Sequence, residues 1–217
     1  MLKILLLAAT DFEIAPFVAA LSAKNQVVKK KYDIHICIAG IGQLQTTFAL
    51  TKALLQSDFD LVIQAGVAGA FSRDLNLGDL ALVETEILAD LRVQNKDGST
   101  SDFFEINLMD ENDFPFKDGK LWSKNDSIIQ FDLPVTKSLT INTVHGNKNA
   151  IDSISTIYDA EIENMEGAAA FYTCAQLGIN CVQVRAISNY VEPRNRAAWN
   201  MPLAIKNLNN YLIYELL

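Results

Sequence analysis

The sequence predicts an α/β fold: a single domain over residues 1–217, with three α/β/α layers around a central parallel or mixed β-sheet. Short, continuous apolar runs such as Leu2–Ala9 and Leu61–Ala65 are typical of strands that are buried on both faces. Segments with helical spacing separate these runs, and strands that alternate with helices indicate a sheet covered on both sides. The length of 217 residues, half of them apolar, is enough for one substantial core.

The N-terminal part predicts two successive strand–helix units. The strand Leu2–Ala9 leads into a helix over Asp11–Ala23, for which Thr10 or Asp11 is the expected cap. The strand Tyr32–Ala39 leads through two glycines into a helix over Gln43–Gln56. Four apolar residues of this second helix have the spacing of a single buried face: Leu44, Phe48, Leu50 and Leu54.

The remaining elements follow the same logic, with one interruption. The strand Leu61–Ala65 ends in a predicted turn at Gly66-Val67-Ala68-Gly69. After the interruption, Gly178 is the expected end of a helix whose small residues Gly167–Ala170 predict close approach to the sheet. The other predicted elements are strands at Asp79–Ile87, Ser138–Val144 and Asn180–Ile187, and helices at Asn149–Tyr158, at Glu166–Leu177 and from about Pro202 to the C-terminus.

The interruption is the segment Arg92–Asp132, which is polar and rich in turns but also rich in aromatic residues. Aromatic side chains at this density usually pack against another part of a protein. We therefore expect this segment to cover a binding site or to meet a partner subunit. Its aromatic residues are Phe103, Phe104, Phe114, Phe116 and Trp122.

Charge and composition exclude several functions. The net charge of -8 argues against nucleic-acid binding, which depends on Lys and Arg neutralising phosphates, and the basic run Lys29–Lys31 is explained by a solvated turn. No apolar run approaches the ~20 residues of a membrane span, and no signal peptide is recognisable, so we expect a cytoplasmic protein. The three cysteines lie in apolar segments and are expected to be reduced. Two histidines are too few for a metal cluster, so no metal or other cofactor is expected.

Candidate site residues lie just beyond the carboxyl ends of the predicted strands, where ligands bind in open α/β sheets. Glu13, Gly40-Ile41-Gly42, Gly66–Gly69 and Asn189 follow four such ends, and Glu166 opens a helix. Each carboxylate also has a structural explanation, because acids favour the first turn of a helix. Arg185, near the end of an apolar strand, needs a buried carboxylate partner.

These segments resemble the purine nucleoside phosphorylase and hydrolase superfamily, and most closely its nucleosidase branch. The resemblance runs along nearly the whole chain and is weakest over Arg92–Asp132. It is carried by the segment at Glu13, Ala39–Gly42, Gln64–Gly69, Asn164-Met165-Glu166 and Arg185–Asn189.

The resemblance implies a central mixed sheet wrapped by helices. It also implies hydrolysis of an N-glycosidic bond through an oxocarbenium-like ribosyl centre. Glu13 would then be the general base that deprotonates water, with Gly66, Val67 and Ala68 beside the substrate. Glu166 would bind the ribose hydroxyls and Met165 would pack against the sugar, while Arg185 would fix the carboxylates. The family also commonly forms homo-oligomers, so a dimer or larger assembly is expected.

Asn189 is the informative departure from the adenine-releasing nucleosidases, which carry Asp at this position. An amide can donate to a 6-oxygen and accept from a protonated N7, a pattern that suits hypoxanthine. Together with the segment Val191–Arg196 this asparagine resembles the futalosine hydrolases, whose substrate has a carboxyphenyl ketone on the 5′ side of ribose.

The candidates for binding this 5′ group are Arg194, Arg196, Trp199 and the phenylalanines of Arg92–Asp132, although each arginine is equally explained as a solvated charge. The alternative functions are a 6-oxopurine nucleoside phosphorylase, a methylthioadenosine-type nucleosidase and a nucleoside-binding protein without catalysis.

Overall fold

The computed structural model describes residues 1–24, 31–126 and 128–217. Most of the predicted basic turn at Lys29–Lys31 therefore lies outside the described residues. No helix in the described part of the chain is both long enough and apolar enough to span a lipid bilayer.

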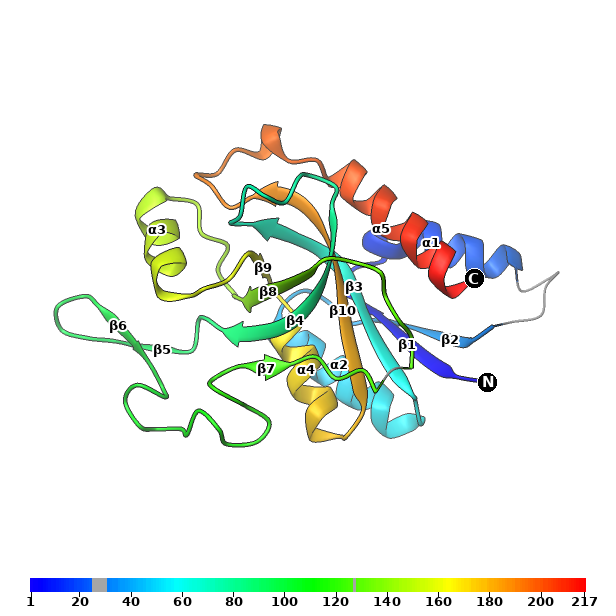
Figure 1. Cartoon of the computed structure of the whole chain (residues 1–217), viewed down its shortest axis with the longest axis horizontal. Helices are drawn as coiled ribbons and strands as arrows, with labels where there is room; N and C mark the ends of the chain where they lie inside the picture. The colour runs from blue at the N-terminus through cyan, green and yellow to red at the C-terminus, as the bar shows by residue number, and fades with distance from the viewer. Residues whose placement is uncertain (25–30, 127) are drawn as a thin grey trace.

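The centre of the fold is an eight-stranded mixed sheet, as predicted (Figure 1). The parallel pairs are β1–β2, β1–β3, β3–β10, β4–β8 and β8–β9, whereas β10–β4, β3–β9 and β4–β7 are antiparallel. The strands are β1 (Lys3–Ala8), β2 (Asp33–Ile38), β3 (Leu61–Ala70), β4 (Leu80–Leu88), β7 (Leu121–Trp122), β8 (Val135–Thr140), β9 (Ile162–Asn164) and β10 (Asn180–Tyr190).

The sheet is not a fully open one. Strand β10 pairs with β4 and also with β3, so the path β10-β4-β8-β9-β3 returns to its starting strand. This closure brings the ends of β3 and β10 next to β9, which pairs with Gly69 and Ala70 at the end of β3. Residues from these three strands therefore meet at one end of the sheet.

Helices cover both faces of the sheet, which gives the expected three layers (Figure 1). Helices α1 (Asp11–Lys24) and α5 (Met201–Leu216) pack on one face, and α2 (Gln43–Gln56) and α4 (Gly167–Gln176) pack on the other. Alternate residues of β1 enter the two cores, because side chains of a strand point to opposite faces in turn. The remaining helical elements are α3 (Lys148–Ile157) and the short 3-10 helix η1 (Arg196–Ala198).

The predicted turn at Gly66–Gly69 is wrong, because β3 continues through these residues to Ala70. Pairing with β10 extends the strand, up to the pairs Asn189–Gly69 and Tyr190–Ala70. For the same reason Asn189 lies inside β10, beside a register shift, and not beyond its end. Strand β8 is also displaced from the prediction, since it begins at Val135 and ends at Thr140.

The predicted apolar face of α2 is only half correct. Leu50 and Leu54 are buried together with Thr46, but Leu44 is 85% exposed and Phe48 is 72% exposed. The helix carries two apolar stripes, and the sheet covers only the one that contains residues 46, 50 and 54.

The segment Arg92–Asp132 packs Phe104 and Phe116 away from the predicted site, whereas Phe114 is 70% exposed and Trp122 is 41% exposed. It contains the hairpin of β5 (Arg92–Gln94) and β6 (Thr100–Asp102), and also β7. The rings of Phe104 and Phe116 meet edge to face, with their centroids 5.5 Å apart. The centroid of the Phe116 ring is also 6.1 Å from that of Tyr172 in α4.

Candidate active site

The candidate active site is a cavity of about 390 Å³ beside the carboxyl ends of β1, β3 and β10. It brings together most of the residues predicted from the sequence, although they are up to 186 positions apart, from Glu13 to Trp199. The residues that line it are Ala9, Thr10, Phe12, Glu13, Ile41, Val67, Ala68, Gly69, Ile141, Val144, Glu163, Asn164, Met165, Glu166, Ser188, Asn189, Trp199 and Met201.

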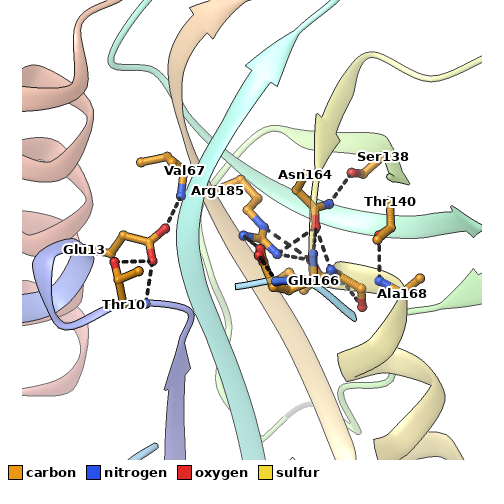
Figure 2. A network of polar contacts seen from close by, with 12 residues as sticks. Thr10, Glu13, Val67, Ser138, Thr140, Asn164, Glu166, Ala168 and Arg185 are labelled. Carbon is orange, nitrogen blue, oxygen red and sulfur yellow. Dashed lines mark hydrogen bonds and ion pairs between the residues drawn. The ribbon is translucent and has the colours of Figure 1, made fainter. Parts of the chain in front are cut away.

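Glu13 is held rigidly in the first turn of α1 and is 7% exposed (Figure 2). Its Oε2 accepts hydrogen bonds from the Thr10 backbone N–H and hydroxyl, both at 3.0 Å, and its Oε1 accepts from the Val67 N–H at 3.2 Å. The bond from the Thr10 N–H is half of a capping box, so Glu13 does cap the helix. Oε2 therefore uses both of its lone pairs, whereas Oε1 retains one that is available to water in the cavity.

The buried Asn209 of α5 fixes the backbone that carries Glu13. Its amide nitrogen donates to the Glu13 carbonyl at 2.8 Å, and its amide oxygen accepts from the Phe17 N–H at 2.9 Å. These two backbone groups would bond to each other in a regular helix. The amide is inserted between them, next to Pro16, which has no N–H of its own to donate.

Glu166 lies at the N-cap of α4, on the opposite side of β3 from Glu13 (Figure 2). Its Oε1 accepts from the Gly42 N–H at 2.9 Å, and its Oε2 is 3.9 Å from the Arg185 Nη1. Burial raises the pKa of Glu166, while Arg185 and the Gly42 N–H act in the opposite direction. The two glutamates therefore face one cavity from two separate elements.

Arg185 is 1% exposed and has the buried carboxylate partner that the sequence predicted, namely Glu166. Its Nη2 donates to Asn164 Oδ1 and to Gln183 Oε1, both at 3.1 Å. The guanidinium lies directly over Gly66, where a Cβ atom would be 2.6 Å from Arg185 Nη1 and 3.0 Å from Glu13 Oε1. Gly66 is therefore required for the close approach of these side chains, although it does not line the cavity itself.

A buried polar network beneath the cavity was not predicted from the sequence. Asn164 donates to Glu86 Oε1 at 2.6 Å and to Ser138 Oγ at 2.8 Å, and Thr140 donates to Glu86 Oε2 at 2.8 Å. Burial raises the pKa of Glu86, opposed mainly by Arg185. A Cβ atom on Gly167 would overlap this carboxylate, so the predicted close approach of α4 to the sheet is confirmed. The signal in the sequence that could have indicated this network was Glu86 itself, an acidic residue inside an otherwise apolar strand pattern.

Asn189 and Glu163 form the other end of the cavity. Asn189 Oδ1 accepts from the Ser188 hydroxyl at 2.8 Å, and its Nδ2 donates to the Tyr190 carbonyl at 3.0 Å. The amide retains one N–H and one lone pair for a ligand. Glu163 was not singled out from the sequence, yet it lines the cavity and is buried.

The predicted 5′-side residues are only partly brought to the site. Trp199 lines the cavity, and Arg194 borders a small extension of it together with Asn189 and His145. Arg196 is exposed and lies over the Trp199 ring, with its guanidinium 5.9 Å from the ring centroid. Phe103, Phe104 and Phe116 instead line a separate cavity of about 580 Å³ within and around Arg92–Asp132. No described residue of that segment lines the site, so it does not cover the site within this chain.

The described residues contain no group of three or more His, Cys, Asp or Glu side chains arranged to hold a metal ion. The three cysteines are free thiols, and Cys174 and Cys181 are buried.

A model of the phosphorylase superfamily matches residues 3–214. The chain belongs to this superfamily. The futalosine hydrolase of Thermus thermophilus is 30% identical over 173 residues, which cover 78% of this chain and 75% of the relative. The 5′-methylthioadenosine/S-adenosylhomocysteine nucleosidase of Haemophilus ducreyi is 26% identical over 194 residues, covering 83% of this chain and 78% of the relative.

Solved structures share the same phosphorylase-superfamily fold. The futalosine hydrolase of Helicobacter pylori superimposes with a TM-score of 0.76 at 17% identity, covering 100% of this chain and 98% of the other. A methylthioadenosine/S-adenosylhomocysteine nucleosidase from Colwellia psychrerythraea gives a TM-score of 0.77 at 17% identity, covering 99% of this chain and 94% of the other. The protein is therefore an enzyme, an N-glycosyl hydrolase of the nucleosidase type.

Proposed function

We propose that this nucleosidase hydrolyses the N-glycosidic bond of futalosine and releases hypoxanthine and dehypoxanthine futalosine, a step of menaquinone biosynthesis. Relatives named futalosine hydrolase include those of Thermus thermophilus and, at 26% identity over 186 residues, Acidothermus cellulolyticus. A relative named aminodeoxyfutalosine nucleosidase, from Campylobacter jejuni, is 25% identical over 209 residues, so base choice has to be argued from the site.

The observation that carries the proposal is the amide of Asn189 at one end of the cavity. Its free N–H can donate to the 6-oxygen of hypoxanthine, and its oxygen can accept from N7 once that nitrogen is protonated. The 6-amino group of adenine would instead point a donor at this donor. Such an unpaired buried group typically costs ~1–3 kcal/mol, enough to select one base over the other.

The other end of the cavity suits the attack of water on ribose. Glu13 takes a proton from the attacking water as general base. Glu166 accepts hydrogen bonds from the ribose hydroxyls, and Met165 packs against the sugar. As the C1′–N9 bond breaks, positive charge develops on the sugar between these carboxylates, which stabilise it electrostatically. Arg185 holds Glu166 in place from below, through the ion pair and the contacts over Gly66.

The 5′ substituent of futalosine is an aromatic carboxylate, and its proposed neighbours are aromatic or cationic. Trp199 and Phe12 line the cavity, and Phe12 is exposed at its mouth. Arg194 and Arg196 lie in the same segment as Trp199 and provide the positive charge that a carboxylate attracts.

Phosphorolysis is disfavoured by the composition of the cavity. A phosphate nucleophile needs several cations around it. None of the described residues that line the cavity is Lys or Arg, whereas three are glutamates. Water is therefore the proposed nucleophile.

The proposal includes a cytoplasmic homo-oligomer, a dimer or larger. An apolar surface made of Phe12, Ile41, Leu44 and Phe48 runs from the mouth of the cavity onto α2, and each of these side chains is more than half exposed. A second copy of the chain seated on this surface would close the cavity to bulk water. Light scattering of the wild type and of Phe48→Glu tests this, because the variant should dissociate and a monomeric wild type would contradict it.

The substrate experiment follows base release from futalosine, inosine and methylthioadenosine, each with and without phosphate and with and without a chelator. We expect hypoxanthine from futalosine at a rate that neither phosphate nor chelator alters. Faster cleavage of methylthioadenosine would assign the protein to the methylthioadenosine-type nucleosidases. Activity that requires phosphate would assign it to the phosphorylases.

A further inference from the structure

Glu163 is a buried carboxylate that faces the base end of the cavity and has no role in the proposed attack of water on ribose. It lies in β9 and is 5% exposed, and its Oε2 has no hydrogen-bond partner among the described residues. In the β3–β9 pair it stands opposite Gly69, which also pairs with Asn189 of β10. A Cβ atom on Gly69 would lie 3.1 Å from Asn189 Nδ2 and 3.4 Å from Glu163 Cγ. The two side chains therefore flank one glycine.

The proposed reaction leaves one chemical requirement open at this position. The purine accepts the electron pair of the C1′–N9 bond, and it leaves readily only if a ring nitrogen gains a proton. The amide of Asn189 can bind that nitrogen but has no acidic proton to give. Glu13 and Glu166 are committed to the water and the ribose.

Glu163 has the environment of an acid that is still protonated near neutral pH. Burial, with a further contribution from Asp90, raises its pKa to about 7. The other titratable groups that border the small extension of the cavity come from the end of β10 and from the segments after β8 and β10: His145, Tyr190, Glu192 and Arg194. None of these side chains donates a hydrogen bond to Glu163 Oε2.

We propose that Glu163 is a catalytic residue, the general acid that protonates N7 of the departing purine, an assignment that rests on the proposed function. The oxygen of water bonds to C1′ while the C1′–N9 bond breaks and its electron pair moves into the purine ring. The carboxyl proton of Glu163 passes to N7, so that the base leaves neutral, and the water proton passes to Glu13. Exchange with solvent then returns a proton to Glu163 and removes one from Glu13.

The first test measures kcat of Glu163→Gln and of the wild type on two substrates whose leaving groups differ in their need for a proton. Glutamine keeps the size of the side chain but cannot donate an acidic proton. On futalosine the variant should lose ~10²-fold or more in kcat. On 4-nitrophenyl β-D-ribofuranoside, whose nitrophenolate leaves without protonation, it should stay within about threefold of the wild type. Equal losses on the two substrates, or no loss on futalosine, would overturn the assignment.

The second test is the pH profile of kcat/KM, which also applies if the nitrophenyl riboside proves a poor substrate. The wild type should lose activity above about pH 7 as Glu163 ionises, and Glu163→Gln should lack this alkaline limb. His145→Gln is the matched control, because histidine is the side chain that most often serves as a general acid and His145 borders the same small extension. The pH profile of His145→Gln should keep the alkaline limb. A limb that disappears in His145→Gln and persists in Glu163→Gln would overturn the assignment.

Failure of the proposed substrate can be distinguished from failure of this inference. If the wild type releases no hypoxanthine from futalosine, the substrate proposal is wrong, and both tests are then run on whichever purine nucleoside the wild type cleaves. Loss of kcat in Glu163→Gln on that nucleoside, with the nitrophenyl riboside spared, supports the acid. An unchanged kcat of Glu163→Gln on that nucleoside overturns the assignment of Glu163 as the general acid.

Discussion

Replacing Glu163 with glutamine should make the folded protein less sensitive to pH, whatever the role of this residue in catalysis. Burial raises the folded-state pKa of Glu163 from 4.5 to about 7. Between these values the folded state holds a proton that the unfolded state has released. Its contribution to stability is therefore complete below about pH 4.5 and is lost as the pH rises through 7.

The size of the effect follows from the same two values. One pKa unit corresponds to about 1.4 kcal/mol, so the whole contribution of Glu163 is about 3 kcal/mol. The buried Glu86 and Glu166 also have raised pKa values, but both are present in the wild type and in the variant. The difference between the two proteins therefore isolates Glu163.

Urea unfolding of the wild type and Glu163→Gln at pH 5, 6, 7 and 8 measures this difference. The free energy of unfolding of the variant should rise relative to the wild type by about 2 to 3 kcal/mol between pH 5 and pH 8. Phosphate-free buffers of constant ionic strength keep other electrostatic effects equal. A difference that stays constant over this range would refute the protonated, desolvated state of Glu163 and weaken its assignment as an acid.

Four further substitutions test the roles of individual residues. Glu13→Gln should reduce kcat by roughly 10²-fold or more with little change in substrate binding, because it removes the base but keeps its shape; near-normal turnover would leave Glu13 only its capping role. Glu166→Gln should lower kcat and also raise the dissociation constant, measured by calorimetry with a ribose analogue, since it contacts the sugar. Asn189→Asp should lose ~10- to 100-fold in rate on the 6-oxo nucleoside and gain relative activity on a 6-amino analogue with the same 5′ group; unchanged base preference would remove Asn189 from base recognition. Gly66→Ala should destabilise the fold and reduce kcat, because its Cβ would lie 2.6 Å from Arg185 Nη1; a thermal melt and a rate equal to those of the wild type would contradict that packing.

The sequence predicted those features that depend on strand order and on local pattern. The layers and α2 at Gln43–Gln56 follow from buried strands that alternate with helices, whereas the mixed sheet was implied by the resemblance. Glu13, Glu166 and Arg185 were found because each lies at a helix start or near the end of a predicted strand. The resemblance to the nucleosidase branch supplied their proposed roles, which the bare pattern did not.

The errors arose where a residue is constrained by distant contacts. The glycines at Gly66 and Gly69 suggested a turn, but Gly66 is required because the Arg185 side chain from β10 crosses it. Glu86 is buried through bonds to Thr140 and Asn164, which lie 54 and 78 positions further along the chain. Glu163 reaches the site only because β9 pairs with the end of β3. No local pattern contains these pairings.

The measurement that tests the central claim most directly is the ratio of kcat/KM for futalosine to that for its 6-amino counterpart, in phosphate-free buffer with the wild-type enzyme. Both substrates carry the same 5′ group, so the ratio reports recognition of the base alone. The amide of Asn189 predicts a preference of ~10-fold or more for futalosine, with release of hypoxanthine. A ratio near one, or a preference for the 6-amino compound, would contradict the account.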